Sequence, residues 1–305
     1  MLAIALALAA SCCWGTSDFL GGLQTRRLGV ITVMVGVQGA PLLVVAGLVL
    51  ATQPAEPGAQ AAIVSVLAGV VGLAGLSALY RALALGPMSL VAPISATGAA
   101  LPAAVGVAAG DRPSVLQALG LAVAVVGVVI AARPVTQGAA RPIDGTAARP
   151  ATQGAARPAE ADGPPGDPQS RLGVVLAILA AVGIGCFLLG AHVGARGGVL
   201  WFLLLSRLSG VLPLAAILAR QGPSALPRPR QLPPLLAVAA LDGSATALLA
   251  VANRHGAVSI VSVVGSLYPA VTVLLAHGLL GERLGRSQAV GVAGAMAGVA
   301  LISAG

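Results

Sequence analysis

Residues 232 to 253 read LPPLLAVAALDGSATALLAVAN, and Asp242 carries the only formal charge between Arg230 and Arg254. About 20 apolar residues in a row are long enough to cross the hydrocarbon core of a bilayer as a helix. This stretch therefore predicts a membrane-spanning helix that holds one carboxylate near its centre.

The composition of the whole chain agrees with that prediction. Of the 305 residues, 57% are hydrophobic and 9% are charged, and the mean hydropathy is +0.97. Soluble domains carry about 25% charged residues, and small apolar residues suit helices that pack closely in lipid. The net charge of +8 is spread over single or paired arginines between apolar runs. That distribution favours loops beside an anionic leaflet over a nucleic-acid surface.

Ten apolar runs predict an all-α membrane protein with ten transmembrane helices. They lie near 2–23, 28–50, 61–80, 88–109, 115–132, 171–193, 198–219, 232–253, 258–279 and 287–304. Cys12, Cys13 and Cys186 fall inside runs and lack disulfide or metal spacing, so we expect them to pack as small apolar residues. No phosphate loop, metal-ligand motif or nucleophile elbow is present. We therefore expect no cofactor, no metal, no catalytic residue and no enzymatic activity.

Residues 133–170 divide the chain into two parts, 1–132 and 171–305. The decapeptide RPVTQGAARP at 133–142 returns as RPATQGAARP at 149–158, in a stretch without aromatic residues or an apolar period. Such a segment buries too little surface to fold, so it is predicted to be a disordered linker.

The two parts read as repeats of five helices each. A shift of 170 or 171 residues places 86–89 (GPMS) on 256–259 (GAVS), and 110–112 (GDR) on 281–283 (GER). Because each repeat has an odd number of spans, the two halves must be inverted in the membrane. Inverted repeats are typical of secondary transporters, with the site at the midplane between the halves.

The pattern resembles the drug/metabolite transporter superfamily, specifically its ten-helix EamA-type members. The resemblance rests on 14–17 (WGTS), on the Gly-acid-Arg turns at 110–112 and 281–283, and on Tyr268 followed by Pro269. The resemblance implies a gradient-driven transporter that exports a small organic metabolite or drug by alternating access. The first half departs from the family pattern, with Asp111 in place of Glu and Gly98 in place of the expected proline.

Polar residues inside the spans are the candidate site, because a charge in the bilayer core is costly and needs an explanation. Asp242 and Arg207 lie at the centres of their runs, and Asp18 lies in the last third of the first. Helical spacing puts Thr246 and Asn253 on the face of Asp242, and Trp14 on that of Asp18. Gln38 matches Arg207 in the repeat frame. The predicted substrate-binding or cavity-lining residues are Trp14, Asp18, Gln38, Arg207, Asp242, Thr246, Asn253 and Tyr268.

Each of these residues also has a structural interpretation. Asp242 and Arg207 could form a buried ion pair that only fixes helix packing, and Asp18 could be solvated near Arg26. Trp14 and Tyr268 could simply pack. Because burial far from water disfavours an ionised carboxylate, Asp242 is the candidate for proton coupling, unless Arg207 stays beside it.

A turn and two histidines also have an expected role. The Gly-Glu-Arg turn is expected to cap and orient helices, with gating as the alternative. His192 and His277, near the ends of runs, are expected at the membrane interface.

The expected partners are a small-molecule substrate and the lipid bilayer, with protons as a candidate coupling ion and no nucleic acid. The chain is expected in the inner (plasma) membrane as a monomer or homodimer. The alternative function is a non-transporting membrane scaffold or an intramembrane enzyme.

The arginine distribution bears on orientation. The loops on one side carry Arg26, Arg27, Arg81, Arg220, Arg228, Arg230, Arg283 and Arg286, against Arg112, Arg196 and Arg254 on the other. The positive-inside rule then places both termini outside, whereas the resemblance implies both inside. We follow the charge count.

Overall fold

The computed structural model describes residues 2–99, 101, 105, 114–131, 168–222, 226–255, 264–265, 267–282 and 284–304. Within these ranges the chain is helical and contains no strand. The α-helices are α1 (Leu2–Leu28), α2 (Val30–Thr52), α3 (Ala59–Leu85), α4 (Met88–Ala96), α6 (Val115–Ala131), α7 (Pro168–Gly194), α8 (Val199–Gln221), α9 (Leu232–His255), α11 (Tyr268–Leu280) and α12 (Arg286–Ala304). Short 3-10 turns are η1 (Thr97–Ala99), η2 (Ala195–Gly197) and η4 (Pro229–Gln231). Most of the predicted linker, up to residue 167, lies outside the described residues.

Six helical stretches among the described residues are long and apolar enough to cross a membrane. They are Leu2–Leu28, Val30–Thr52, Ala59–Leu85, Arg171–Gly197, Val199–Arg220 and Pro229–Leu249. The chain is thus a multi-pass membrane protein. Parts of the predicted runs 88–109 and 258–279 lie outside the described residues, so ten spans stay a prediction.

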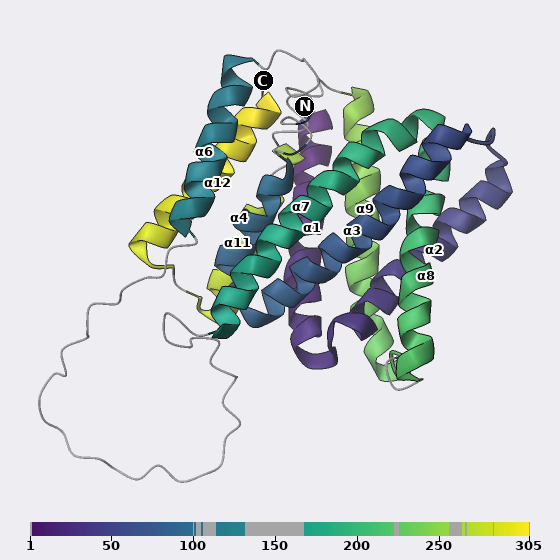
Figure 1. Cartoon of the computed structure of the whole chain (residues 1–305), viewed down its shortest axis with the longest axis horizontal. Coiled ribbons are helices and arrows are strands. Elements are labelled where there is room, and N and C mark those ends of the chain that lie inside the picture. Colours follow the sequence, from purple (N-terminus) through teal and green to yellow (C-terminus); the bar gives the residue numbers. More distant parts are fainter. Residues whose placement is uncertain are drawn as a thin grey trace, which may run out of the picture.

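The helices form one bundle (Figure 1). α3 and α7 pack along each other through its middle, where α1 and α9 also form a pair. α2 and α8 pack together at one edge of the bundle, and α6 and α12 form a separate pair at the other edge. The buried core centres on Tyr80, Phe19 and Met34, with Leu83 and Met88 beside them.

Glycines allow the closest helix approaches. Gly183 of α7 lies directly against Gly75 of α3, where a Cβ on Gly183 would be 2.6 Å from the Gly75 Cα atom. Gly298 of α12 lies equally close to the backbone of α6 at Ala124. Small residues let helix backbones approach this closely in membrane proteins. Gly298 therefore serves helix packing within the chain.

Substituting Gly183 with alanine is expected to lower the free energy of unfolding by about 1–3 kcal/mol, because the added methyl group must push α7 away from α3. Thermal unfolding of the purified protein in detergent, followed by circular dichroism, measures the effect. Gly47→Ala in α2 is the matched control, since a Cβ there meets nothing within 4 Å. Equal melting temperatures for Gly183→Ala and the control would contradict the close α3–α7 contact.

Candidate functional site

Arg207 of α8 joins three helices through its guanidinium group. One terminal nitrogen donates a 2.8 Å hydrogen bond to Oδ2 of Asp242 on α9, and this contact is also an ion pair. The other terminal nitrogen donates to Oε1 of Gln38 on α2. We call Gln38, Arg207 and Asp242 the central polar cluster.

The apolar sequence explains why these residues meet. Arg207 and Asp242 both lie well inside their helices, where no neighbouring side chain of the same helix carries an opposite charge. The arginine and aspartate side chains are 18% and 20% exposed, and Gln38 is 5% exposed. A charge far from water needs a partner of opposite sign and further hydrogen bonds. The forked guanidinium supplies two donors in one plane, so it serves both acceptors.

The structure places Arg207 beside Asp242. This is the arrangement that the sequence analysis named as the exception to proton coupling by Asp242, so that argument weakens. Gln38, which matches Arg207 in the repeat frame, accepts a hydrogen bond from it directly. Whether the ion pair binds substrate or only fixes the helices stays a prediction.

Thr246 and Asn253 were predicted on the face of Asp242. The Thr246 hydroxyl donates a 3.0 Å hydrogen bond to the backbone carbonyl of Asp242, one turn earlier in α9. It therefore serves its own helix and does not contact the charged groups of the cluster. The Asn253 side chain lies outside the described residues.

Asp18 of α1 is nine-tenths buried, at 9% exposure. It lies near enough to Asp242, Tyr80 and Tyr268 to interact electrostatically with each of them. Its burial excludes the solvated position near Arg26 that the sequence left open. Trp14, one turn earlier, packs edge-to-face against Tyr268 of α11, with ring centroids 6.1 Å apart.

Sequence reasoning missed Tyr80 of α3. Its side chain is 1% exposed and interacts electrostatically with Asp18, Asp242 and Arg207. Its ring packs against Gly21 of α1, whose missing side chain leaves room for it. The only sequence signal was that Tyr80 is the single aromatic residue in its run, and a tyrosine next to Arg81 looks like an interfacial anchor.

A second polar site lies at one end of the bundle, where Glu282 follows α11. Its carboxylate accepts hydrogen bonds from the backbone nitrogen atoms of Met88 at 3.1 Å and Ser89 at 2.9 Å, and from the Ser89 hydroxyl at 2.9 Å. These nitrogens are in the first turn of α4, where backbone N–H groups lack helical partners. A negative charge is also favourable at a helix N-terminus. The expected capping role of the Gly-Glu-Arg turn is confirmed for Glu282.

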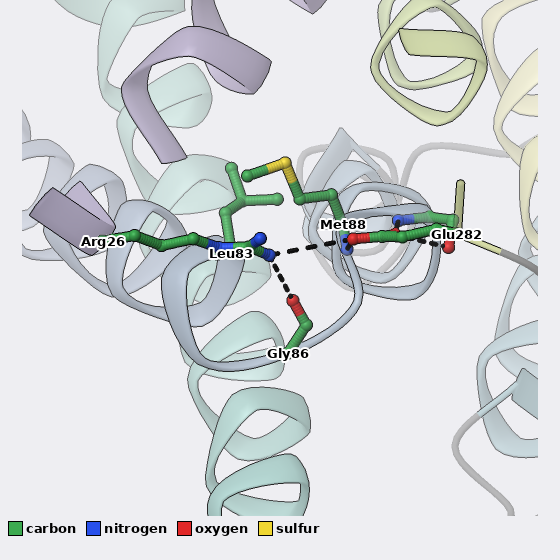
Figure 2. Close-up of polar contacts among 6 residues, drawn as sticks. Arg26, Leu83, Gly86, Met88 and Glu282 are labelled. Atoms are coloured by element: carbon green, nitrogen blue, oxygen red, sulfur yellow. Dashed lines mark hydrogen bonds and ion pairs between the residues drawn. The ribbon is translucent and has the colours of Figure 1, made fainter. Parts of the chain in front are cut away.

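Arg26, in the last turn of α1, extends this network (Figure 2). Its guanidinium donates to the carbonyl oxygens of Leu83 at 3.1 Å and Gly86 at 3.2 Å, and lies 3.7 Å from the Glu282 carboxylate. We call these residues, with Met88 and Ser89, the Glu282 network. It ties the ends of α1, α3 and α4 to the turn between α11 and α12.

The remaining predicted turn residues have mixed outcomes. His277 holds the Glu282 turn, because its Nδ1 atom lies 2.9 Å from the Glu282 carbonyl oxygen. Arg283, the side chain of His192 and the first-half turn at 110–112 lie outside the described residues. In the described part of the chain, no group of three or more His, Cys, Asp or Glu residues is placed to hold a metal ion.

Residues 171–304 match the model of the EamA-like transporter family. The second half of the chain is therefore similar to this family. EamA-like proteins are transporters, which argues against an enzyme and supports a membrane protein of the drug/metabolite superfamily. No curated protein sequence matches the chain.

A solved structure described only as "Crystal structure of protein" has a similar fold. It matches with a TM-score of 0.55 and 16% identity, covering 98% of this chain and 95% of that one. This likeness extends the fold comparison beyond the half that the EamA model matches.

Proposed function

We propose that this chain, whose second half is similar to the EamA-like transporters, is a gradient-driven transporter of a small organic solute, acting as an exporter in the plasma membrane by alternating access between two inverted halves. The central polar cluster is the observation that supports this most directly. Charged groups inside membrane-spanning helices are costly, and they are found chiefly where a solute or ion passes.

The helix contacts support the two-repeat organisation. In the repeat frame, α1, α2, α3, α4 and α6 correspond to α7, α8, α9, α11 and α12. The packing of α1 against α9 then has its counterpart in α7 against α3, and that of α1 against α11 in α7 against α4. The contact of α2 with α9 likewise matches that of α8 with α3, while α2–α8 and α6–α12 pair equivalent helices. Such an exchange pattern is what a pseudo-two-fold axis between halves produces.

The polar contacts suggest what moves. Gln38 belongs to the first half, whereas Arg207 and Asp242 both belong to the second. Rocking of one half against the other would break the Gln38–Arg207 hydrogen bond and keep the Arg207–Asp242 ion pair. The Glu282 network also joins the halves, so its bonds would have to open for access from that end.

Cells that overproduce the wild-type chain are expected to release at least one small metabolite faster than cells with Arg207→Gln. The reason is that the substitution removes the only cation of the central polar cluster. Mass spectrometry of the medium over time provides the measurement, with membrane content matched by immunoblot. Arg220→Gln is the matched control, because Arg220 is an exposed arginine in the last turn of the same helix.

Identical release profiles for the wild type, Arg207→Gln and cells without the protein would reject the transporter and favour a non-transporting scaffold.

A further inference from the structure

Asp18 has no partner for its charge. No described residue gives its carboxylate a hydrogen bond or an ion pair, although the residue is nine-tenths buried. Every fully enclosed side-chain oxygen or nitrogen atom among the described residues does have a hydrogen-bond partner. The unpartnered oxygen atoms of Asp18 must therefore provide the part of this residue that a small molecule reaches.

The charges around Asp18 do not balance. Asp242 and Asp18 interact, and the cation Arg207 is bound to Asp242. Two carboxylates and one guanidinium leave one negative charge when both acids are ionised. Among the helices packed against α1, the described part of α2 has no charged residue, and Arg81 of α3 is exposed. Arg26 on α1 itself is held by the Glu282 network. A buried charge without a partner is strongly disfavoured.

Aromatic residues pack against α1 about one turn before and one turn after Asp18, Tyr268 at Gly15 and Tyr80 at Gly21. Trp14 lies one helical turn from Asp18 on the same face of α1, and it contacts Tyr268 edge-to-face. Tyr268 and Tyr80 both lie within electrostatic reach of Asp18. Aromatic faces attract organic cations, most strongly when the cation is withdrawn from water. A carboxylate beside such rings complements an ammonium group in both charge and shape.

We propose that Asp18, Trp14 and Tyr268 form a subsite for the ammonium group of an organic amine, so that the transported solute is a cationic or zwitterionic amine. This inference rests on the proposed transport function and specifies its substrate class. The bound ammonium group supplies the positive charge that the Asp18, Asp242 and Arg207 group lacks.

Trp14 can report on this subsite directly. The chain has two tryptophans, so Trp201→Phe leaves Trp14 as the only one. The purified full chain carrying this change is titrated in detergent with ethylamine, cyclohexylamine and 2-phenylethylamine. Each amine is compared with the neutral alcohol of the same skeleton, namely ethanol, cyclohexanol and 2-phenylethanol. The measurement is the saturable change in Trp14 fluorescence.

We expect at least one amine to bind about tenfold or more tightly than its alcohol. Asp18→Asn in the same background should reduce amine affinity to that of the alcohol, and Asp18→Glu should keep the preference for the amine. Thr16→Ala is the control on the same helix, since its hydroxyl bonds only to the Cys12 carbonyl among the described residues. Should Asp18→Asn fail to fold, the amine-to-alcohol comparison in the parent protein still decides.

Equal affinity for amines and alcohols, no response to any of the three amines, or an unchanged preference in Asp18→Asn would each overturn the ammonium subsite. The transporter itself is judged separately, by metabolite release that depends on Arg207. If release depends on Arg207 but the protein does not prefer amines to alcohols, the transport function is retained and only the ammonium subsite is rejected. Equal release by wild-type cells, Arg207→Gln cells and cells without the protein would reject the transport function itself.

Discussion

Glu282→Ala is expected to lower the free energy of unfolding by about 2–4 kcal/mol, because three donors lose a charged acceptor at once. Two of those donors are first-turn backbone N–H groups of α4, and the Glu282 side chain is only 10% exposed. Alanine leaves these groups without a partner and removes the favourable charge at the helix N-terminus. Thermal unfolding of the purified protein in detergent measures the loss.

Two variants make the Glu282 result specific. Glu282→Gln keeps one acceptor oxygen in place and should lose only part of the stability that alanine loses. Glu56→Ala removes an exposed acid from the loop between α2 and α3 and should change nothing. A melting temperature for Glu282→Ala equal to that of Glu56→Ala would show that the cap contributes little to the fold.

Arg207→Gln is expected to destabilise the protein by about 3–5 kcal/mol, because it leaves the Asp242 carboxylate without its ion-pair partner. Asp242→Asn should still insert and fold, because the oxygen of the asparagine amide can accept a hydrogen bond from Arg207. Gln38 also stays hydrogen-bonded to Arg207. We expect this variant to lose most transport, or the pH dependence of transport, because it removes an ionisable group. Unfolding in detergent and metabolite release from cells are the two measurements.

The double variant Arg207→Gln with Asp242→Asn separates a binding role from a packing role. Both neutral side chains should hydrogen-bond to each other, so stability should return toward that of the wild type. A transport role predicts that release stays low in the double variant. Recovery of both stability and release, with unchanged pH dependence, would show that the Arg207–Asp242 pair has only a structural role.

Much of this architecture could be predicted from the residues. Backbone groups in lipid must be satisfied within the chain, so long apolar runs with few charges predict helices, and six such spans are present in the described residues. The cost of a charge in lipid also singled out Asp18, Arg207 and Asp242 from the sequence. Helical period alone placed Trp14 on the same face as Asp18.

The pairings between helices could not be predicted in the same way. The sequence offered Arg207 two carboxylates. Only the tertiary structure, in which α2 packs against both α8 and α9, brings Arg207 to Asp242 and leaves Asp18 without an ion-pair partner among the described residues. Likewise, nothing in the sequence indicated that Glu282 would cap α4, whose Ser89 lies 193 positions away, or that Tyr80 would lie among the charged groups.

The physical reason is that these helices are apolar on nearly every side. An amphipathic helix shows which face it buries, whereas an all-round apolar helix leaves its rotation about its own axis unspecified. The sequence by itself therefore determined that the chain spans the membrane as helices, and which side chains are too polar to lie in lipid without a role. Rotation and depth are set by contacts such as Gly75 on Gly183, so only the tertiary structure decided which polar groups meet.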